Sequence, residues 1–239
     1  MMYDDCSRLK NVFVLPQVKF DDDVSIGKNT HFICVQPFLG ASYEEMVRRG
    51  AKPISANFPF GAEGTTKWLW AIAERFGISK AKFDVVVAAP KLRAEQAVAA
   101  VADELRGKSV FFFPDSQLEI PLARFLAAEC GMELTEVGSP FIHKSLVHAD
   151  LEDLPAPTQI SEGQDVDRQL DRCREAQPEL TISGMGLANP LEAEGLATKC
   201  SSHPPQGSAT PVNASRIIFC GCLSKNSCGH PQYRGWPHN

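Results

Sequence analysis

Two glycine-containing segments could bind a ligand through their backbones. The first, Gly-Ala-Glu-Gly-Thr-Thr, holds Gly61, Gly64 and Thr65 ahead of a predicted helix. Backbone N–H groups at such a helix entry can bind an anion or a carboxylate. The segment lacks the lysine of a phosphate-binding loop and the Gly-x-Gly-x-x-Gly order, so nucleotide binding is not indicated. A glycine-rich helix entry without a ligand is the simpler interpretation, and we carry both forward.

The second glycine segment follows a predicted strand at residues 180–183 and opens another predicted helix. Gly184 and Gly186 permit close approach to the backbone, and we expect Asn189-Pro190 to mark the helix entry. Close approach would serve a large flat ligand or tight packing equally well. These residues and those of the first segment are our candidates for lining a substrate cavity.

A cysteine cluster near the end of the chain could bind a metal ion. Cys220, Cys222, Cys228 and His230 form the pattern Cys-x-Cys-x5-Cys-x-His, which supplies the four soft ligands of a tetrahedral zinc site. The spacing does not match a common two-plus-two zinc knuckle, so an adventitious cluster is the favoured interpretation and we predict no metal site.

An irregular segment carries two histidines beside two aspartates. His143 and His148 lie close to Asp150 and Asp153 in the sequence, and such groups can form a proton relay near neutral pH. Histidines of a surface loop are the alternative interpretation, and we favour it.

Composition bounds the function classes. The chain has 239 residues, a net charge of −5 and 44% hydrophobic residues, as expected of one or two compact units. The absence of a basic patch argues against nucleic acid as a partner. We find neither an apolar stretch long enough for a membrane span nor a signal-peptide pattern. We therefore expect a cytoplasmic protein, or a stromal one if it is of plastid origin.

Short apolar runs alternate with segments of helical periodicity, which is typical of a parallel sheet covered by helices on both sides. We predict helices that open at Ser42, at Thr65 or Thr66, at Pro90, and close to Glu119 or Ile120. The predicted strands are residues 31–35, 52–56, 83–88, 109–113, 132–137 and 180–183.

The fold class is therefore α/β, with two Rossmann-like parallel-sheet units. We predict a lead-in at residues 1–24, a first unit at 25–107 and a second unit at 108–199. Residues 200–239 lose the periodicity and are predicted to be a disordered tail.

Residues 58–66, 107–138 and 161–199 resemble the N subunits of light-independent protochlorophyllide reductases, nitrogenase-like enzymes of pigment synthesis. The amino-acid sequence of these segments is closer to the form found in bacteria that make bacteriochlorophyll. The resemblance implies the fold of nitrogenase molybdenum–iron subunits, with Rossmann-like domains around a cavity. It also implies reduction of the D-ring double bond of protochlorophyllide to give chlorophyllide.

The same resemblance implies partners and cofactors. Family members assemble with B subunits as an N2B2 heterotetramer that shares a [4Fe-4S] cluster. An iron–sulfur L protein dimer, which binds ATP-Mg and hydrolyses ATP, supplies the electrons.

The chain departs from the family at both ends. It has no counterpart of the first domain, which holds the cluster cysteines in the family. Its sequence after Lys199 is unrelated to that of the family. We therefore transfer no cluster ligand to Cys6, Cys34, Cys130 or Cys173, expect no cofactor on this chain alone, and expect it to be inactive by itself. A nitrogenase-type cofactor-assembly scaffold and a Rossmann-like ligand-binding module without catalysis remain the alternatives.

Overall fold

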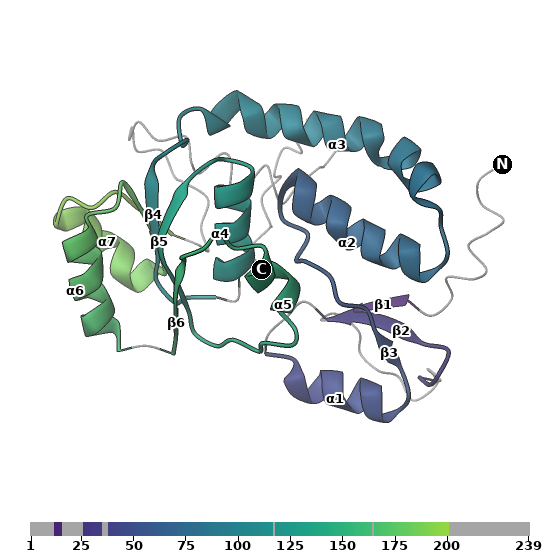
Figure 1. Ribbon diagram of the computed structural model, residues 1–239. Helices are drawn as coiled ribbons and strands as arrows, with labels where there is room; N and C mark the ends of the chain where they lie inside the picture. Colours follow the sequence, from purple (N-terminus) through teal and green to yellow (C-terminus); the bar gives the residue numbers. More distant parts are fainter. Residues whose placement is uncertain (1–11, 16–25, 35–37, 117, 164, 201–239) are drawn as a thin grey trace, which may run out of the picture.

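The computed structural model describes residues 12–15, 26–34, 38–116, 118–163 and 165–200 (Figure 1). The tail beyond Cys200 lies outside the described residues. The cysteine cluster of Cys220, Cys222, Cys228 and His230 therefore stays a prediction without a structural description.

A five-stranded parallel sheet forms the larger part of the fold (Figure 1). The strand order β6-β5-β4-β7-β8 has every neighbouring pair parallel, which confirms the predicted fold class. The strands are β4 (Ser109–Phe112), β5 (Glu133–Ser139), β6 (Gln159–Glu162), β7 (Leu180–Ser183) and β8 (Thr198–Cys200). Of these, β6 and β8 were missed by the sequence prediction.

Helices cover both faces of this sheet, as Figure 1 shows. One face carries α4 (Glu119–Ala128) and α5 (His148–Glu152), and the other carries α6 (Val166–Ala176) and α7 (Met185–Ala193). Because side chains alternate along a strand, Val110 and Phe112 of β4 pack into the α4 core, whereas Phe111 packs into the core beside α6 and α7.

A smaller parallel sheet precedes the larger one. Its strands β1 (Val12–Leu15), β2 (His31–Cys34) and β3 (Lys52–Pro53) lie in the order β1-β2-β3. Helix α1 (Gly40–Arg48) follows β2, and its Met46 packs with Phe32. The predicted start of this helix at Ser42 is wrong, because α1 begins at Gly40 after Leu39, without a side-chain cap.

The predicted strand at residues 83–88 is wrong. These residues lie in α3 (Lys80–Ala102), which follows α2 (Gly61–Arg75). The Ser79 side chain accepts a hydrogen bond from the Lys82 N–H and caps α3. Val85 is 79% exposed, and Pro90, predicted to open a helix, lies inside α3. A short apolar run cannot distinguish a strand from a helix by periodicity alone.

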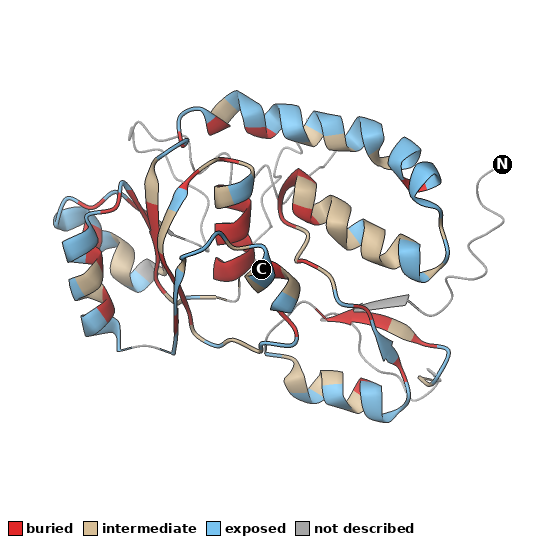
Figure 2. Ribbon diagram, in the orientation of Figure 1, coloured by how far each residue is buried: buried red, intermediate tan, exposed pale blue. Residues whose placement is uncertain are grey.

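Burial differs sharply between the helices. Figure 2 shows α4 buried along most of its length, whereas α3 is exposed along most of its outer surface. In the described part of the chain, no helix combines the length and the apolar character needed to cross a bilayer. The division into units at residues 25–107 and 108–199 stays a prediction.

Candidate functional site

The first glycine segment packs against the end of α4. Gly61 has φ of +70°, and a Cβ atom at this position would overlap the Phe125 ring and the Glu129 carboxylate. That carboxylate accepts hydrogen bonds from the N–H groups of Ala62 at 2.7 Å and Glu63 at 3.1 Å. The helix entry therefore does bind a carboxylate, as its N–H groups and dipole favour, and the carboxylate comes from the same chain.

Neither threonine of this segment caps a helix, so that prediction is wrong. Helix α2 begins at Gly61, and both hydroxyls lie inside it. Thr65 Oγ1 donates to the Pro59 carbonyl at 3.2 Å, and Thr66 Oγ1 donates to the Ala62 carbonyl at 2.6 Å. These bonds stabilise the first turns of α2, and both threonine hydroxyls donate to carbonyl groups of the same segment.

A buried ion pair lies beside the first glycine segment. Arg124 Nε is 2.7 Å from Asp150 Oδ1, and the two side chains are 1% and 4% exposed. Arg124 Nη2 also donates to the Phe58 carbonyl at 3.0 Å, and Asp150 Oδ2 accepts the Phe58 N–H at 2.8 Å. Burial raises the pKa of Asp150, although Phe58 and Arg124 oppose the rise. The pair joins α4 and α5 to the chain that leads into α2.

The proton relay, which the sequence analysis did not favour, is not assembled. Asp150 bonds Arg124, whereas Asp153 lies 2.7 Å from Lys67 Nζ and His148 lies 3.2 Å from Glu152. The fourth candidate, His143, lies 3.0 Å from the Ser145 hydroxyl. Asn57 Nδ2 donates to both aspartates, at 3.4 Å to Asp150 Oδ1 and 2.9 Å to Asp153 Oδ2, whereas the two histidines contact other groups.

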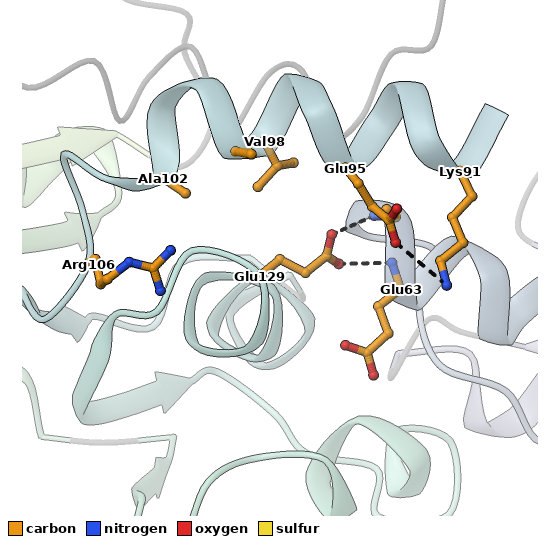
Figure 3. Close-up of a pocket in the computed structure, with 9 residues that line it drawn as sticks. Glu63, Lys91, Glu95, Val98, Ala102, Arg106 and Glu129 are labelled. Carbon is orange, nitrogen blue, oxygen red and sulfur yellow. Dashed lines mark hydrogen bonds and ion pairs between the residues drawn. The ribbon is translucent and has the colours of Figure 1, made fainter. Parts of the chain in front are cut away.

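A cavity of about 510 Å³ opens between α2, α3 and α4 (Figure 3). Figure 3 shows the Glu129 carboxylate directed at the backbone of α2, with Lys91 and Glu95 on the facing side of α3. Burial raises the pKa of Glu129, against the hydrogen bonds from α2. The described lining residues are Ala62, Glu63, Lys91, Glu95, Val98, Ala99, Ala102, Arg106 and Glu129.

The described lining supplies carboxylates and cations but no hydroxyl, thiol or imidazole side chain. It therefore lacks the Ser–His or Cys–His pair that many covalent catalysts use, and the cavity can hold water or a polar group.

The second glycine segment lies where the sheet order reverses. From β4 the chain proceeds outward to β5 and β6, and it then returns to β7 on the other side of β4. Ligands of open α/β sheets bind at such a switch point, outside the carboxyl ends of the strands. Gly184 follows β7, and a Cβ atom there would lie 2.8 Å from Cγ of Asp115, which follows β4. Among the described residues, Gly186 would place its Cβ in open space.

The predicted helix entry at Asn189-Pro190 is wrong. Helix α7 begins at Met185, directly after Gly184, and both residues lie inside it. Both residues are exposed. Gly184 and Gly186 therefore remain the two residues of this segment at the carboxyl edge of the sheet.

Sequence reasoning missed the buried carboxyl group at the switch point. Glu119 is 2% exposed. Its Oε1 accepts the N–H groups of Asp115, at 3.0 Å, and of Ser116, and its Oε2 is buried without a hydrogen-bond partner among the described residues. Burial raises the pKa of Glu119 despite these bonds. Ser116 stands three residues before Glu119, which is a capping-box spacing. This signal indicated a helix start close to Glu119 or Ile120 and not a site.

The two glycine segments contact opposite ends of α4. Gly184 meets Asp115, which precedes α4, whereas Gly61 meets Glu129, which follows it. The candidate cavity residues thus form two separate sites in the described structure.

The three cysteines whose side chains are described do not fit an iron–sulfur cluster. Cys34, Cys130 and Cys173 lie in three different hydrophobic clusters. Burial raises the pKa of the Cys130 thiol to about 12, which opposes the thiolate form that a cluster requires. Among the described residues, no group of three or more His, Cys, Asp or Glu side chains could hold a metal ion.

The sequence matches a family model. Residues 8–200 match the model of the nitrogenase component 1 type oxidoreductases.

Curated relatives give a finer match. The chain is 60% identical over 186 residues to the light-independent protochlorophyllide reductase subunit N of Roseobacter denitrificans, 61% over 188 residues to that of Dinoroseobacter shibae, and 54% over 193 residues to that of Bradyrhizobium sp. strain ORS 278. These matches cover 78%, 79% and 81% of this chain but only 44%, 44% and 45% of the relatives. The resemblance to N subunits is confirmed, and the chain spans less than half the length of these relatives.

Solved structures agree in fold. The structure titled "Nitrogenase Cp1 at pH 6.5" has a TM-score of 0.57 at 16% identity, covering 81% of this chain and 44% of that chain. "Nitrogenase Cp1 at pH 5" has a TM-score of 0.57 at 13% identity, covering 81% and 46%. The predicted nitrogenase-type α/β fold is confirmed.

Proposed function

This chain belongs to the nitrogenase component 1 type oxidoreductases, and we propose that it is a portion of the N subunit of a light-independent protochlorophyllide reductase. The observation that carries the proposal is the 60% identity over 186 residues to the subunit N of Roseobacter denitrificans. The family model extends over residues 8–200, which include both sheets and both glycine segments. The proposed reaction adds two electrons and two protons to the D-ring double bond of protochlorophyllide and gives chlorophyllide.

The proposed contribution of this chain is a wall of the pigment cavity. The carboxyl edge of the large sheet, at Gly184 and Gly186, supports this role because the described structure leaves open space before Gly186. The first segment, with Gly61, Gly64 and Thr65, supports the wall from behind, since it packs on α4. In this proposal the units at residues 25–107 and 108–199 close the cavity from two sides.

A partner surface is also part of the proposal. Helix α3 exposes Val85 at 79%, Val86 at 53% and Leu92 at 54%, and apolar patches of this kind mark interaction sites. We assign this face to contacts within an N2B2 assembly, with the B subunit as the nearest partner and the L protein dimer as the electron donor. No role for nucleic acid or for a membrane is proposed, and the compartment is the cytoplasm, or the stroma in a plastid.

The redox centre is assigned outside the described residues. A [4Fe-4S] cluster would supply low-potential one-electron chemistry, and ATP-Mg would bind on the L protein. Cys34, Cys130 and Cys173 are buried in separate clusters, so we propose no cluster ligand among them. It follows that this chain alone does not turn over.

Co-purification tests the proposed function. We would express the tagged chain with the B subunit of the same source, isolate the complex anaerobically, and record iron content and protochlorophyllide absorbance. Recovery of B with bound pigment supports the proposal. Absence of both B and pigment, from a chain shown to be folded by circular dichroism, contradicts it.

A further inference from the structure

Two phenylalanines form a stacked, exposed pair that the fold does not use for its own core. The rings of Phe38 and Phe141 have centroids 5.9 Å apart and planes inclined by 23°. They are 52% and 41% exposed. The His143 ring meets Phe141 edge-on, at 6.3 Å and 73°. Large aromatic side chains left in water forgo a substantial hydrophobic stabilisation, so this surface is suited to being covered.

The segment that carries Phe141 and His143 is held in place by its surroundings. Ser139 Oγ donates to the Phe141 carbonyl at 3.3 Å, and the following Ile142 N–H donates to Glu162 at 2.8 Å. His143 Nδ1 lies 3.0 Å from Ser145 Oγ. A Cβ atom on Gly40, the first residue of α1, would lie 3.0 Å from the His143 ring. The segment that carries Phe141 and His143 is therefore held in place by the fold, and Phe38 stacks on it.

Both rings lie just beyond the carboxyl ends of parallel strands. Phe38 follows β2 of the small sheet, and Phe141 follows β5 of the large sheet. This is the edge at which α/β sheets bind ligands. The contact between the Phe38 and Phe141 rings joins this edge of the small sheet to that of the large sheet.

We infer that Phe38, Phe141 and His143 form a stacking platform for a planar conjugated tetrapyrrole. Aromatic groups attract flat π systems in offset-stacked or edge-on arrangements at centroid distances of about 4.5–7 Å. A protein partner fits less well, since the aliphatic face of α3 already offers a separate surface of the kind that subunits cover. The inference rests on the proposed function, because the substrate class comes from the names of the relatives.

Pigment titration of single variants tests the platform. The complex of this chain with its B subunit is titrated with protochlorophyllide, and binding is followed by quenching of the pigment's fluorescence. Phe38→Ala and Phe141→Ala are each expected to weaken binding about threefold to tenfold, the range of an aromatic pair. Phe38→Tyr is expected to bind like the parent. Val166→Ala is the control, because Val166 is 41% exposed at the start of α6 and belongs neither to the platform nor to the α3 face.

The outcomes separate the two proposals. If the parent complex binds pigment and both alanine variants bind it equally well while folded, the platform is overturned and the proposed function stands. If Phe38→Ala reduces recovery of B without changing pigment affinity, the pair is a protein contact and the platform is again overturned. If the parent chain neither recovers B nor binds pigment, the proposed function itself fails.

Discussion

The two glycine segments look alike in sequence and differ in what approaches them. At the entry of α2, the space that a Cβ atom would take at Gly61 and Gly64 is occupied by the chain's own side chains. These are the Glu129 carboxylate at Gly61 and the Arg124 guanidinium at Gly64. At the entry of α7, the Asp115 side chain occupies the space that a Cβ atom would take at Gly184. At Gly186 the corresponding space is open in the described structure. A glycine before a helix thus signals close approach, but the approaching group can be the chain itself or a ligand.

The difference assigns distinct roles to the two ends of α4. The end at Glu129 joins the two parts of the fold, and the end at Glu119 faces the switch point of the sheet. Substitutions in the first segment should therefore lower the free energy of unfolding strongly, whereas substitutions at Gly186 in the second segment should change it little.

Gly64→Ala should have the largest effect. The new Cβ would lie 2.9 Å from Cζ of the buried Arg124 and would force the guanidinium away from Asp150. Overpacking and disruption of a buried ion pair together should lower the free energy of unfolding by about 3 kcal/mol. Urea unfolding followed by circular dichroism measures this. A loss below about 1 kcal/mol would show that Arg124 moves aside easily.

Glu129→Ala should have an intermediate effect. It removes the acceptor shared by the Ala62 and Glu63 N–H groups, which is comparable to losing a helix N-cap and worth about 1–2 kcal/mol. Glu95→Ala, which removes an exposed side chain from the lining of the same cavity, is the matched control and should change stability by less than about 0.5 kcal/mol. Equal losses in the two variants would contradict the assignment.

Glu119→Gln should show a pH-dependent effect. Because burial raises the pKa of Glu119 above 4.5, the folded parent holds its proton more tightly than the unfolded chain does. Parent stability from this group falls as pH rises from about 4.5 through the folded-state pKa, by about 1.4 kcal/mol for each pH unit that separates the unfolded-state and folded-state pKa values. The variant lacks this loss, so its stability relative to the parent should improve with rising pH. Urea midpoints measured from pH 4 to 8 provide the test.

Glu136→Gln is the control with opposite sign. Burial raises the pKa of Glu136, but hydrogen bonds from Arg172 and Ser161 outweigh burial and hold the pKa below 4.5. Ionised Glu136 therefore stabilises the parent, and this stability is lost as pH falls through the folded-state pKa. The stability that Glu136→Gln loses relative to the parent should be larger above pH 4.5 than below it. Matching trends for both variants would refute the contrast.

Gly186→Ala should have the smallest effect on stability. Nothing in the described structure lies within 4 Å of the added Cβ, and alanine is favoured over glycine in a helix by up to about 1 kcal/mol. The chain should unfold at the same urea concentration or a slightly higher one. A loss of stability would show that the space before α7 is filled, and a loss of pigment binding alone would assign that space to the ligand.

Much of the large sheet could be predicted from sequence, because its signals are local. The apolar run at 109–113, the helix face of Leu122, Phe125 and Leu126, and the strand at 180–183 match β4, α4 and β7. Their hydrophobic periods arise within a few residues and coincide with their burial. The same long blocks of sequence also carried the resemblance to N subunits, which the relatives confirm.

Tertiary structure decided which groups meet. The run at 83–88 has strand-like composition, yet it lies in α3 because a capped helix continues through it. The pairing of Arg124 with Asp150, the closure of Gly61 by Glu129 and the stacking of Phe38 on Phe141 each join residues from separate elements. Local periodicity contains no information about such partners, since they come together only when the two sheets and their helices pack.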